Sequence, residues 1–308
     1  MSDIDLRLKQ LSYSSALLLH ECPRKYQLYK LRGKEELDDE ENSIKSITFT
    51  FGHVVGEGVQ LIFQGKSIEE IIWAMFLRWD CDLAATNDKQ LKSFYYAVHA
   101  VTSLYESIRV AGFLSEYELV YVDDKPATEL SFAITSPDGF RFRGFVDAVL
   151  RNTLTGEITV LEVKTTSAAS INPAQYKNSS QALGYSVVLD NLFPDISSYK
   201  VLYLPYKAKA MEWEVLPFAK TLLQRAQWIQ QLILDIELIK MYEGLQIYPM
   251  YGESCYNYYS PCEYFGICNM NTQFLIKELS NKHIEQINSE TFTVNLTLQD
   301  LIATQMEK

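Results

Sequence analysis

Three charged side chains, Asp147, Glu162 and Lys164, lie in a segment that otherwise has the composition of buried β-structure. Side chains of a strand alternate between the two faces of a sheet, so Glu162 and Lys164 share one face. Charges in the middle of a sheet are costly unless they are paired or bind a cation. Two carboxylates beside an ammonium group suit a hard divalent cation that bridges to a substrate phosphate. The segment therefore predicts a site for Mg²⁺ or Mn²⁺.

The same segment predicts a β-hairpin. Apolar-rich runs over residues 140–150 and 158–163 are separated by polar, turn-forming residues. A four-residue loop at 153–156 between antiparallel strands would place Asp147 directly opposite Glu162. The carboxylates would then project from the same face as the lysine.

The predicted metal ligands are Asp147, Glu162 and the backbone carbonyl of Val163. A bound cation would neutralise the carboxylates and lower the pKa of a bound water. Lys164 would orient or deprotonate that water, or stabilise charge on phosphorus. The alternative is a buried salt bridge between Glu162 and Lys164 beside an unrelated aspartate, and the hairpin alone does not decide between them.

The elements around the hairpin indicate the fold class. Helices are predicted at 12–31 (two helices), 47–63, 67–79, 87–111 and 219–242, and the segment from Gln181 also reads as a helix. Strands are predicted at 116–122, 127–134, 199–205 and 211–216. This order predicts an α/β fold with a central mixed sheet flanked by helices and a helical N-terminal part.

Composition bounds the class of protein. The 308 residues are 47% hydrophobic and 22% charged, as in an ordinary globular protein, and no run approaches the length of a membrane span. We expect a cytoplasmic protein with no membrane partner. The net charge of −11 counts against a nucleic-acid binder, although a cleft can be locally basic in an acidic protein.

The five cysteines, among them Cys255, Cys262 and Cys268, argue for metal or cluster ligands, or for buried thiols, before disulfides. Four thiolates are the number that holds a [4Fe–4S] cluster. The last three fall within fourteen residues, at spacings that do not fit paired zinc knuckles. Zinc held by four cysteines remains the alternative, as do four unrelated buried thiols.

Residues 144–147, GFVD, followed after fourteen residues by 162–164, EVK, resemble the G-x-x-D … E-x-K core of the PD-(D/E)XK nuclease superfamily. The likeness is to its RecB-like exonuclease branch in particular. Gln181 and Tyr185 resemble the Q-x-x-x-Y helix of that branch, and Glu129 corresponds to the glutamate before the G-x-x-D strand. The resemblance implies that Gln181 orients phosphate or water and that Glu129 is a further acidic contributor.

The helix at 47–63 resembles the G-x-x-x-H helix of the family, whose histidine is a metal ligand. Counting from Gly52, the expected position is Gly56, while His53 stands one residue after the first glycine. Three residues turn a helix by about 300°, so His53 cannot simply replace that side chain. Glu57, one residue after Gly56, is a second candidate to replace the metal-ligand histidine.

Residues 12–26 resemble the S-x-S-x-L … C-P-x-x-Y opening of RecB-like nucleases that carry an iron–sulfur cluster. The likeness makes Cys22 the first cluster ligand and the three late cysteines the others. This arrangement of one early and three late cysteines is similar to that of the AddB-type helicase–nuclease subunit and of related phage and CRISPR-associated nucleases. The gap between Cys255 and Cys262 is wider here than in their usual pattern.

The resemblance as a whole implies a metal-dependent DNA exonuclease of phage or bacterial recombination or repair, with a helicase or recombination protein as partner. A non-catalytic DNA-binding or assembly subunit that keeps the fold is the alternative. The nuclease domain would span 1–270, with a helical insertion at about 47–112 and a C-terminal tail at 271–308. Candidate contacts to nucleic acid are Arg24, Lys25, Arg141, Arg143, Lys177 and Tyr185.

Overall fold

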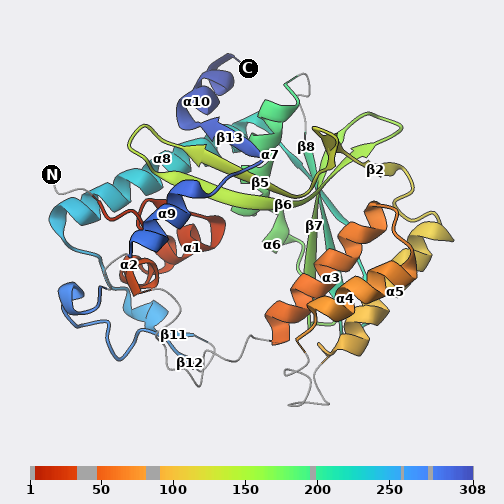
Figure 1. Cartoon of the computed structure of the whole chain (residues 1–308), viewed down its shortest axis with the longest axis horizontal. Coiled ribbons are helices and arrows are strands. Elements are labelled where there is room, and N and C mark those ends of the chain that lie inside the picture. Colours follow the sequence, from red (N-terminus) through yellow and green to blue (C-terminus); the bar gives the residue numbers. More distant parts are fainter. Residues whose placement is uncertain are drawn as a thin grey trace. The chain divides into compact units, whose positions relative to one another are not determined.

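The computed structural model describes residues 4–32, 47–80, 91–194, 199–257, 260–276 and 280–307. The helices (Figure 1) are α1 (Tyr13–Glu21), α2 (Pro23–Arg32), α3 (Ile47–Phe63), α4 (Ile68–Arg78), α5 (Phe94–Arg109), α6 (Ala174–Lys177), α7 (Ser180–Leu192), α8 (Leu222–Leu245), α9 (Asn281–Ser289) and α10 (Leu298–Glu307). The strands are β1 (Gln10–Leu11), β2 (Tyr117–Leu119), β3 (Tyr121–Val122), β4 (Lys125–Pro126), β5 (Thr128–Thr135), β6 (Arg141–Asn152), β7 (Ile158–Thr166), β8 (Tyr199–Lys207), β9 (Glu212–Trp213), β10 (Leu216–Lys220), β11 (Tyr256–Asn257), β12 (Ser260–Pro261) and β13 (Val294–Thr297).

Nine strands of the described residues form one mixed sheet in the order β10-β8-β7-β6-β5-β13, with β1 and β2 on β6 and β9 on β8. The β6–β7 and β8–β10 pairs are antiparallel, whereas β7 pairs with β8 in parallel. A parallel pair needs a crossover, and α6 and α7 form it. The predicted α/β fold with a central mixed sheet is confirmed.

The chain divides into two compact units. Unit 1 comprises Met1–Ser43, Ser131–Gly144 and Ala226–Lys308. Unit 2 comprises Ile44–Leu130 and Phe145–Arg225. Strands β5 and β6 cross the boundary, so each contributes residues to both units.

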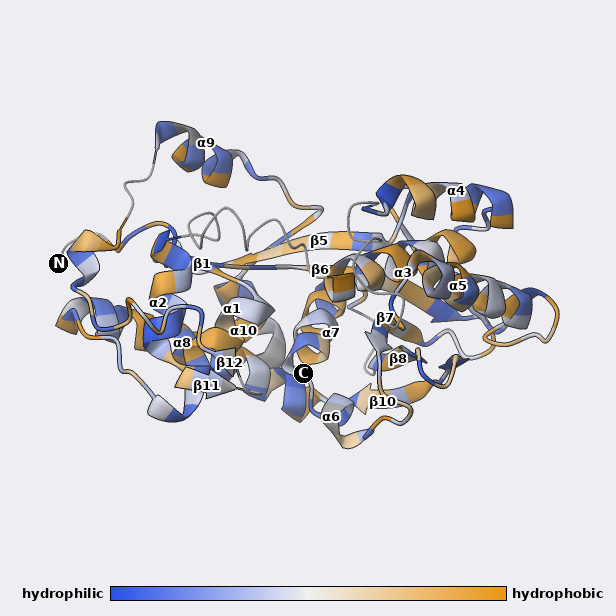
Figure 2. Ribbon diagram, turned by 90° about the horizontal axis from the view of Figure 1, so that it is seen from below, coloured by the Kyte–Doolittle hydropathy of each residue, from blue (hydrophilic) through white to orange (hydrophobic). Residues whose placement is uncertain are grey.

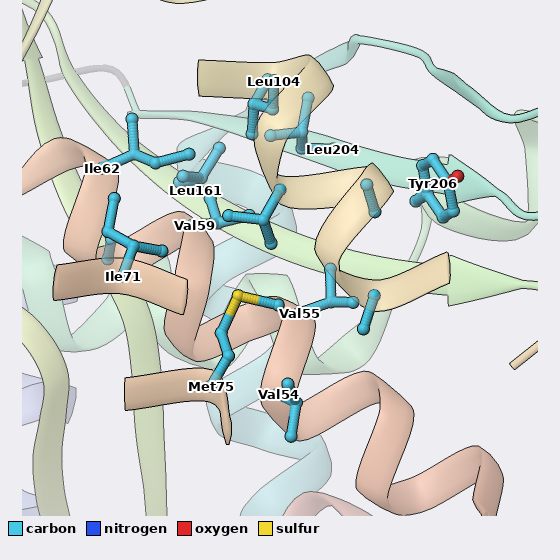
Figure 3. Packing of buried hydrophobic residues seen from close by; sticks show 14 of the residues in the cluster. Val54, Val55, Val59, Ile62, Ile71, Met75, Leu104, Leu161, Leu204 and Tyr206 are labelled. Atoms are coloured by element: carbon cyan, nitrogen blue, oxygen red, sulfur yellow. The ribbon is translucent and has the colours of Figure 1, made fainter. Parts of the chain in front are cut away.

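Unit 2 contains a large hydrophobic core where α3, α4 and α5 pack on the sheet (Figure 3). In Figure 2 these three helices carry both orange and blue segments, because each has an apolar and a polar side. Gly58 permits the close approach of α3 and α5, since a Cβ there would lie 2.6 Å from Val101 Cγ2. Core residues from the helices and strands include Val54, Val55, Val59, Ile62, Ile71, Met75, Leu104, Leu161, Leu204 and Tyr206.

In unit 1, α1 begins with a capping box. Ser12 Oγ accepts the backbone N–H of Ser15, and Ser15 Oγ accepts that of Ser12. Pro23 opens α2, where its missing N–H needs no partner. Tyr26 is fully buried and donates its hydroxyl to the carbonyl of Leu8 over 2.8 Å.

Some boundaries differ from the predicted ones. Helix α8 begins at Leu222, because residues 219–220 pair with β8 as the end of β10. Helix α5 is shorter than the predicted 87–111, of which 87–90 lie outside the described residues. The segment predicted as a C-terminal tail contains β13, which pairs in parallel with β5. Among the described residues, no helix has the length and hydropathy that crossing a bilayer requires.

Candidate active site

The hairpin of β6 and β7 has the predicted register. Ala148 faces Leu161 and Arg151 faces Ile158, and the loop at 153–156 closes the hairpin. The side chain of Asn152 accepts two backbone N–H groups of that loop, at 3.0 Å each. Continuing the register by one pair sets Asp147 opposite Glu162, as the loop length predicted.

Asp147 and Glu162 are held at this pair by the strands themselves. The backbone N–H of Val163 donates to Asp147 Oδ2 over 3.0 Å, which fixes the carboxylate against β7. Glu162 is 1% exposed. The sheet therefore presents two carboxylates from neighbouring strands, of which Glu162 is buried and Asp147 is half-buried.

A polar chain leads away from Glu162. Lys164 Nζ lies 2.5 Å from Glu162 Oε1 and donates to Gln181 Oε1 over 3.2 Å. Gln181 Nε2 in turn donates to the hydroxyl of Tyr185 over 2.6 Å. Gln181 and Tyr185 are four residues apart on α7, so they share one face of the helix. The structure thus brings together the hairpin residues and the two predicted α7 residues.

Electrostatics within this group favour a cation. Burial, followed by the charge of Glu162, raises the pKa of Asp147 well above its usual range, although the Val163 N–H and Lys164 oppose the rise. Burial also raises the pKa of Glu162, against Lys164 and Gln181. Burial and the same carboxylates raise the pKa of Tyr185, so its phenol stays neutral. A positive ion stabilises two neighbouring carboxylates that resist joint ionisation.

Glu129 lies close to this group. Its negative charge contributes to the raised pKa of Asp147 and of Glu162. Its backbone is left-handed, with φ of +49°, and its Oε1 accepts the side-chain N–H of Gln60 over 2.8 Å. Gln60 was not predicted as a site residue. The only sequence signal for it is its spacing, four residues after Gly56 on the same helix.

The two candidate replacements for the missing histidine, His53 and Glu57, each have another contact. His53 is exposed and packs on Phe49, with ring centroids 4.1 Å apart. Glu57 forms an ion pair with Arg78 at 3.6 Å. A Cβ at Gly56 would have no atom within 4 Å.

A sequence profile of the PD-(D/E)XK nuclease superfamily matches residues 10–269, which is most of the chain. The chain belongs to this superfamily. Among solved structures, the chain is similar to the crystal structure of SSO0001, with 14% identity over 85% of this chain and 86% of that chain and a TM-score of 0.37. No curated protein sequence matches it significantly.

The hairpin residues offer a fitting set of donors for a hard divalent cation. Glu162 Oε2 is buried without a hydrogen-bond partner among the described residues. Such an oxygen is costly unless something binds it. The ion pair with Lys164 is formed through Oε1. Asp147, Glu162 and the Val163 carbonyl would hold the cation, and the described residues contain no ready group of three or more His, Cys, Asp and Glu side chains.

The superfamily motif also has a packing requirement in unit 1. Gly144 stands three residues before Asp147. A Cβ at this glycine would lie 2.8 Å from the buried ring of Phe132. Glycine is therefore required at this position for close packing of β6 on β5.

Four free thiols lie in unit 1, on Cys22, Cys255, Cys262 and Cys268. Burial raises the pKa of Cys268, and the other three thiols add to the rise. The backbone N–H of Cys262 donates to the carbonyl of Cys255 over 2.8 Å. The thiols therefore gather in one region, although none of the described residues form a preformed cluster site.

Arg24 differs from its predicted role. It is 7% exposed and donates to the carbonyls of Cys268 and Met270 and to the hydroxyl of Thr272, at 2.6 to 3.1 Å. Gln27 Oε1 accepts a further hydrogen bond from the guanidinium group of Arg24. This geometry fits a structural clamp on the segment after the last cysteine, instead of a contact to nucleic acid.

The other predicted contacts vary in accessibility. Tyr185 is 5% exposed, so it positions Gln181 and does not offer its ring for stacking. Arg143 forms an ion pair with Glu290, and Arg141 donates to a backbone carbonyl of α9. Lys25 pairs with Glu21 at 3.3 Å, whereas Lys177 is exposed.

Proposed function

We propose that the chain is a Mg²⁺- or Mn²⁺-dependent DNA exonuclease of the RecB-like branch, acting in phage or bacterial DNA recombination or repair. The observation that carries the proposal is the pair of half-buried Asp147 and buried Glu162, with a buried Glu162 oxygen that has no hydrogen-bond partner among the described residues and with Lys164 on the same face. Superfamily membership indicates a nuclease and makes DNA the expected substrate.

Each site residue has a proposed part. Asp147, Glu162 and the Val163 carbonyl hold the cation, which when bound neutralises both carboxylates and activates a water. Lys164 positions the attacking water or stabilises charge on phosphorus. Gln181 fixes Lys164 through its Oε1 and orients the phosphate. Glu129 adds negative charge beside the pair.

We further propose that Cys22, Cys255, Cys262 and Cys268 hold a [4Fe–4S] cluster, with Zn²⁺ as the alternative. The gathering of four free thiols in unit 1 supports four ligands of one centre. The first thiol is more than 230 positions from the others. A shared centre would close a long loop and stabilise the fold.

The nuclease proposal is tested with end-labelled linear DNA and Mn²⁺ in anaerobic buffer. We expect progressive loss of DNA, and no loss with Asp147→Asn or Lys164→Met at unchanged far-UV circular dichroism. Covalently closed plasmid should stay intact, because an exonuclease needs an end. Discrete fragments from the plasmid would instead indicate an endonuclease.

The cluster proposal is tested by metal and sulfide analysis of anaerobically purified protein. We expect about four irons and four sulfides per chain. Cys262→Ser should lose them, whereas Cys81→Ser, outside the described residues, should retain them. One zinc without sulfide would establish Zn²⁺ as the bound metal. Retention of the metal by Cys262→Ser would contradict both the iron–sulfur cluster and the zinc site.

A non-catalytic DNA-binding or assembly subunit is the second candidate. Gly56 favours it, because α3 offers no ligand at the position where the resemblance expects a histidine. DNA binding without any Mn²⁺-dependent degradation, on single and double strands, would establish this function. A helicase or recombination protein is the partner class that either function implies.

A further inference from the structure

One side of α3 faces the strands that carry the carboxylates. Gly52, Gly56 and Gln60 are spaced by four residues, so they follow one side of the helix. A Cβ at Gly52 would lie 3.5 Å from Thr165 Oγ1 on β7. One and two turns further along are the open position at Gly56 and then Gln60, which reaches Glu129 on β5. The helix therefore passes along the candidate site.

Glu129 has a strained backbone. A left-handed conformation is unfavourable for a residue with a side chain, which is why glycine usually occupies it. Such strain persists only where the surroundings fix the residue. The side chain is fixed by Gln60, which is 8% exposed and donates over 2.8 Å.

The position of Glu129 has an electrostatic consequence. The strands place it beside the pair, because the carbonyl of Ala127, two residues before Glu129, accepts the backbone N–H of Val149, two residues after Asp147, over 2.9 Å. Its negative charge adds to the raised pKa of Asp147 and of Glu162, although the three form no preformed carboxylate group among the described residues. Magnesium-type cations keep several waters and bind directly to one or two carboxylates. A third carboxylate beside the pair would accept hydrogen bonds from the waters of the cation and would not bind the cation directly.

We propose that Gln60 is a positioning residue, which holds Glu129 as an outer carboxylate that binds the cation of Asp147 and Glu162 through water. This inference rests on the proposed metal-dependent function. The donor is specific to the side-chain amide of Gln60, because a carboxylate acceptor needs an N–H or O–H partner. Second-sphere partners of this kind contribute to metal affinity without touching the metal.

The test measures Mn²⁺ binding by electron paramagnetic resonance of the free ion, without DNA. Gln60→Met keeps the length of the side chain and removes the donor. We expect Mn²⁺ affinity to fall by about tenfold, the lower end of second-sphere effects. Gln64→Met is the matched control, since Gln64 lies four residues after Gln60, directly after the end of α3, and donates to the Thr128 hydroxyl instead of a carboxylate. Its affinity should stay within about twofold of the wild type, because that contact involves no charge near the pair.

A double-mutant cycle separates this role from a structural one. In a Glu129→Gln background, Gln60→Met should cause no further loss of affinity, because its effect passes through the carboxylate. Equal losses in both backgrounds would overturn the proposal, as would wild-type affinity of Gln60→Met. Gln60→Leu replaces the methionine variant if that variant fails to fold.

Failure of the proposed function is recognised independently. Asp147→Asn should abolish Mn²⁺ binding whatever Gln60 does. Wild-type Mn²⁺ affinity of Asp147→Asn would remove the metal site itself. Loss in Asp147→Asn with no loss in Gln60→Met would overturn only the positioning role.

Discussion

The backbone N–H of Val163 donates to Asp147 Oδ2 across 3.0 Å. A main-chain group of one strand thus fixes the carboxylate of the next, directly beside Glu162. The bond holds a charge where burial disfavours it, since burial and Glu162 together raise the pKa of Asp147. The strand register therefore sets the geometry of the candidate site. Without a cation, the negative charge of Asp147 at this position lowers the stability of the fold.

Asp147→Asn should stabilise the metal-free protein, increasingly so as pH rises. Asparagine keeps an acceptor for the Val163 N–H and removes the charge. The folded state raises the pKa of Asp147 above its ordinary value of 3.8, so it binds the proton more tightly than the unfolded chain. The stabilisation that comes from the proton on Asp147 is therefore complete below the ordinary pKa. It is lost as the pH rises through the raised pKa of the folded state.

The measurement is the thermal unfolding midpoint in EDTA between about pH 4 and pH 9. Asp147→Asn should exceed the wild type by a few degrees at the alkaline end and match it at the acidic end. Excess Mn²⁺ should raise the midpoint of the wild type alone. An advantage of the variant that is constant across this pH range would contradict the electrostatic explanation.

The hairpin could be predicted from sequence because its determinants are local. Loop length and the period of two fix which residue faces Glu162, and the four-residue spacing fixes Gln181 with Tyr185. The bond between Gln60 and Glu129 could not be predicted, because it joins positions 69 apart and depends on an unusual backbone conformation. The same holds for Arg24, since three of its four acceptors lie 244 to 248 positions away.

Two glycines of α3 should respond to alanine with opposite signs. Gly56→Ala adds a methyl group where no atom lies within 4 Å, so we expect the usual helix gain of about 0.5–1 kcal/mol. Gly58→Ala would place Cβ 2.6 Å from Val101 Cγ2 and 3.1 Å from the sulfur of Met75. The stiff, fully buried valine cannot move away, and overpacking costs about 1–3 kcal/mol.

Urea denaturation of both variants checks this pair of signs. The midpoint should rise for Gly56→Ala and fall for Gly58→Ala, at similar slopes. Because both substitutions share the same helix and the same chemical change, helix propensity cancels in the comparison. A rise for both would mean that α3 and α5 are not as close as Val101 indicates.

Arg24→Met should destabilise the fold without affecting nucleic-acid binding. The guanidinium group satisfies backbone carbonyls of Cys268 and Met270, and losing charged hydrogen bonds from a buried site costs about 2–4 kcal/mol. Lys177→Ala is the contrasting variant, since Lys177 is exposed. If Lys177 contacts a phosphate, its loss should lower the salt slope of DNA binding by about one while the denaturation midpoint stays unchanged. A lower salt slope in Arg24→Met, measured well below its unfolding midpoint, would restore the predicted DNA contact.

The ion pair of Arg143 with Glu290 makes a further prediction about DNA binding. Glu290 directly follows α9 and pairs with the guanidinium group of Arg143, which is a predicted contact to DNA. Glu290→Gln frees that charge, so we expect tighter DNA binding at low salt and a salt slope steeper by up to about one. Glu285→Gln is the matched control, because it changes the net charge equally from an exposed position on α9 that has no ion pair among the described contacts. Fluorescence anisotropy of labelled DNA across a salt series measures both slopes. Equal slopes for the two variants would show that only net charge matters and that Arg143 does not reach the strand.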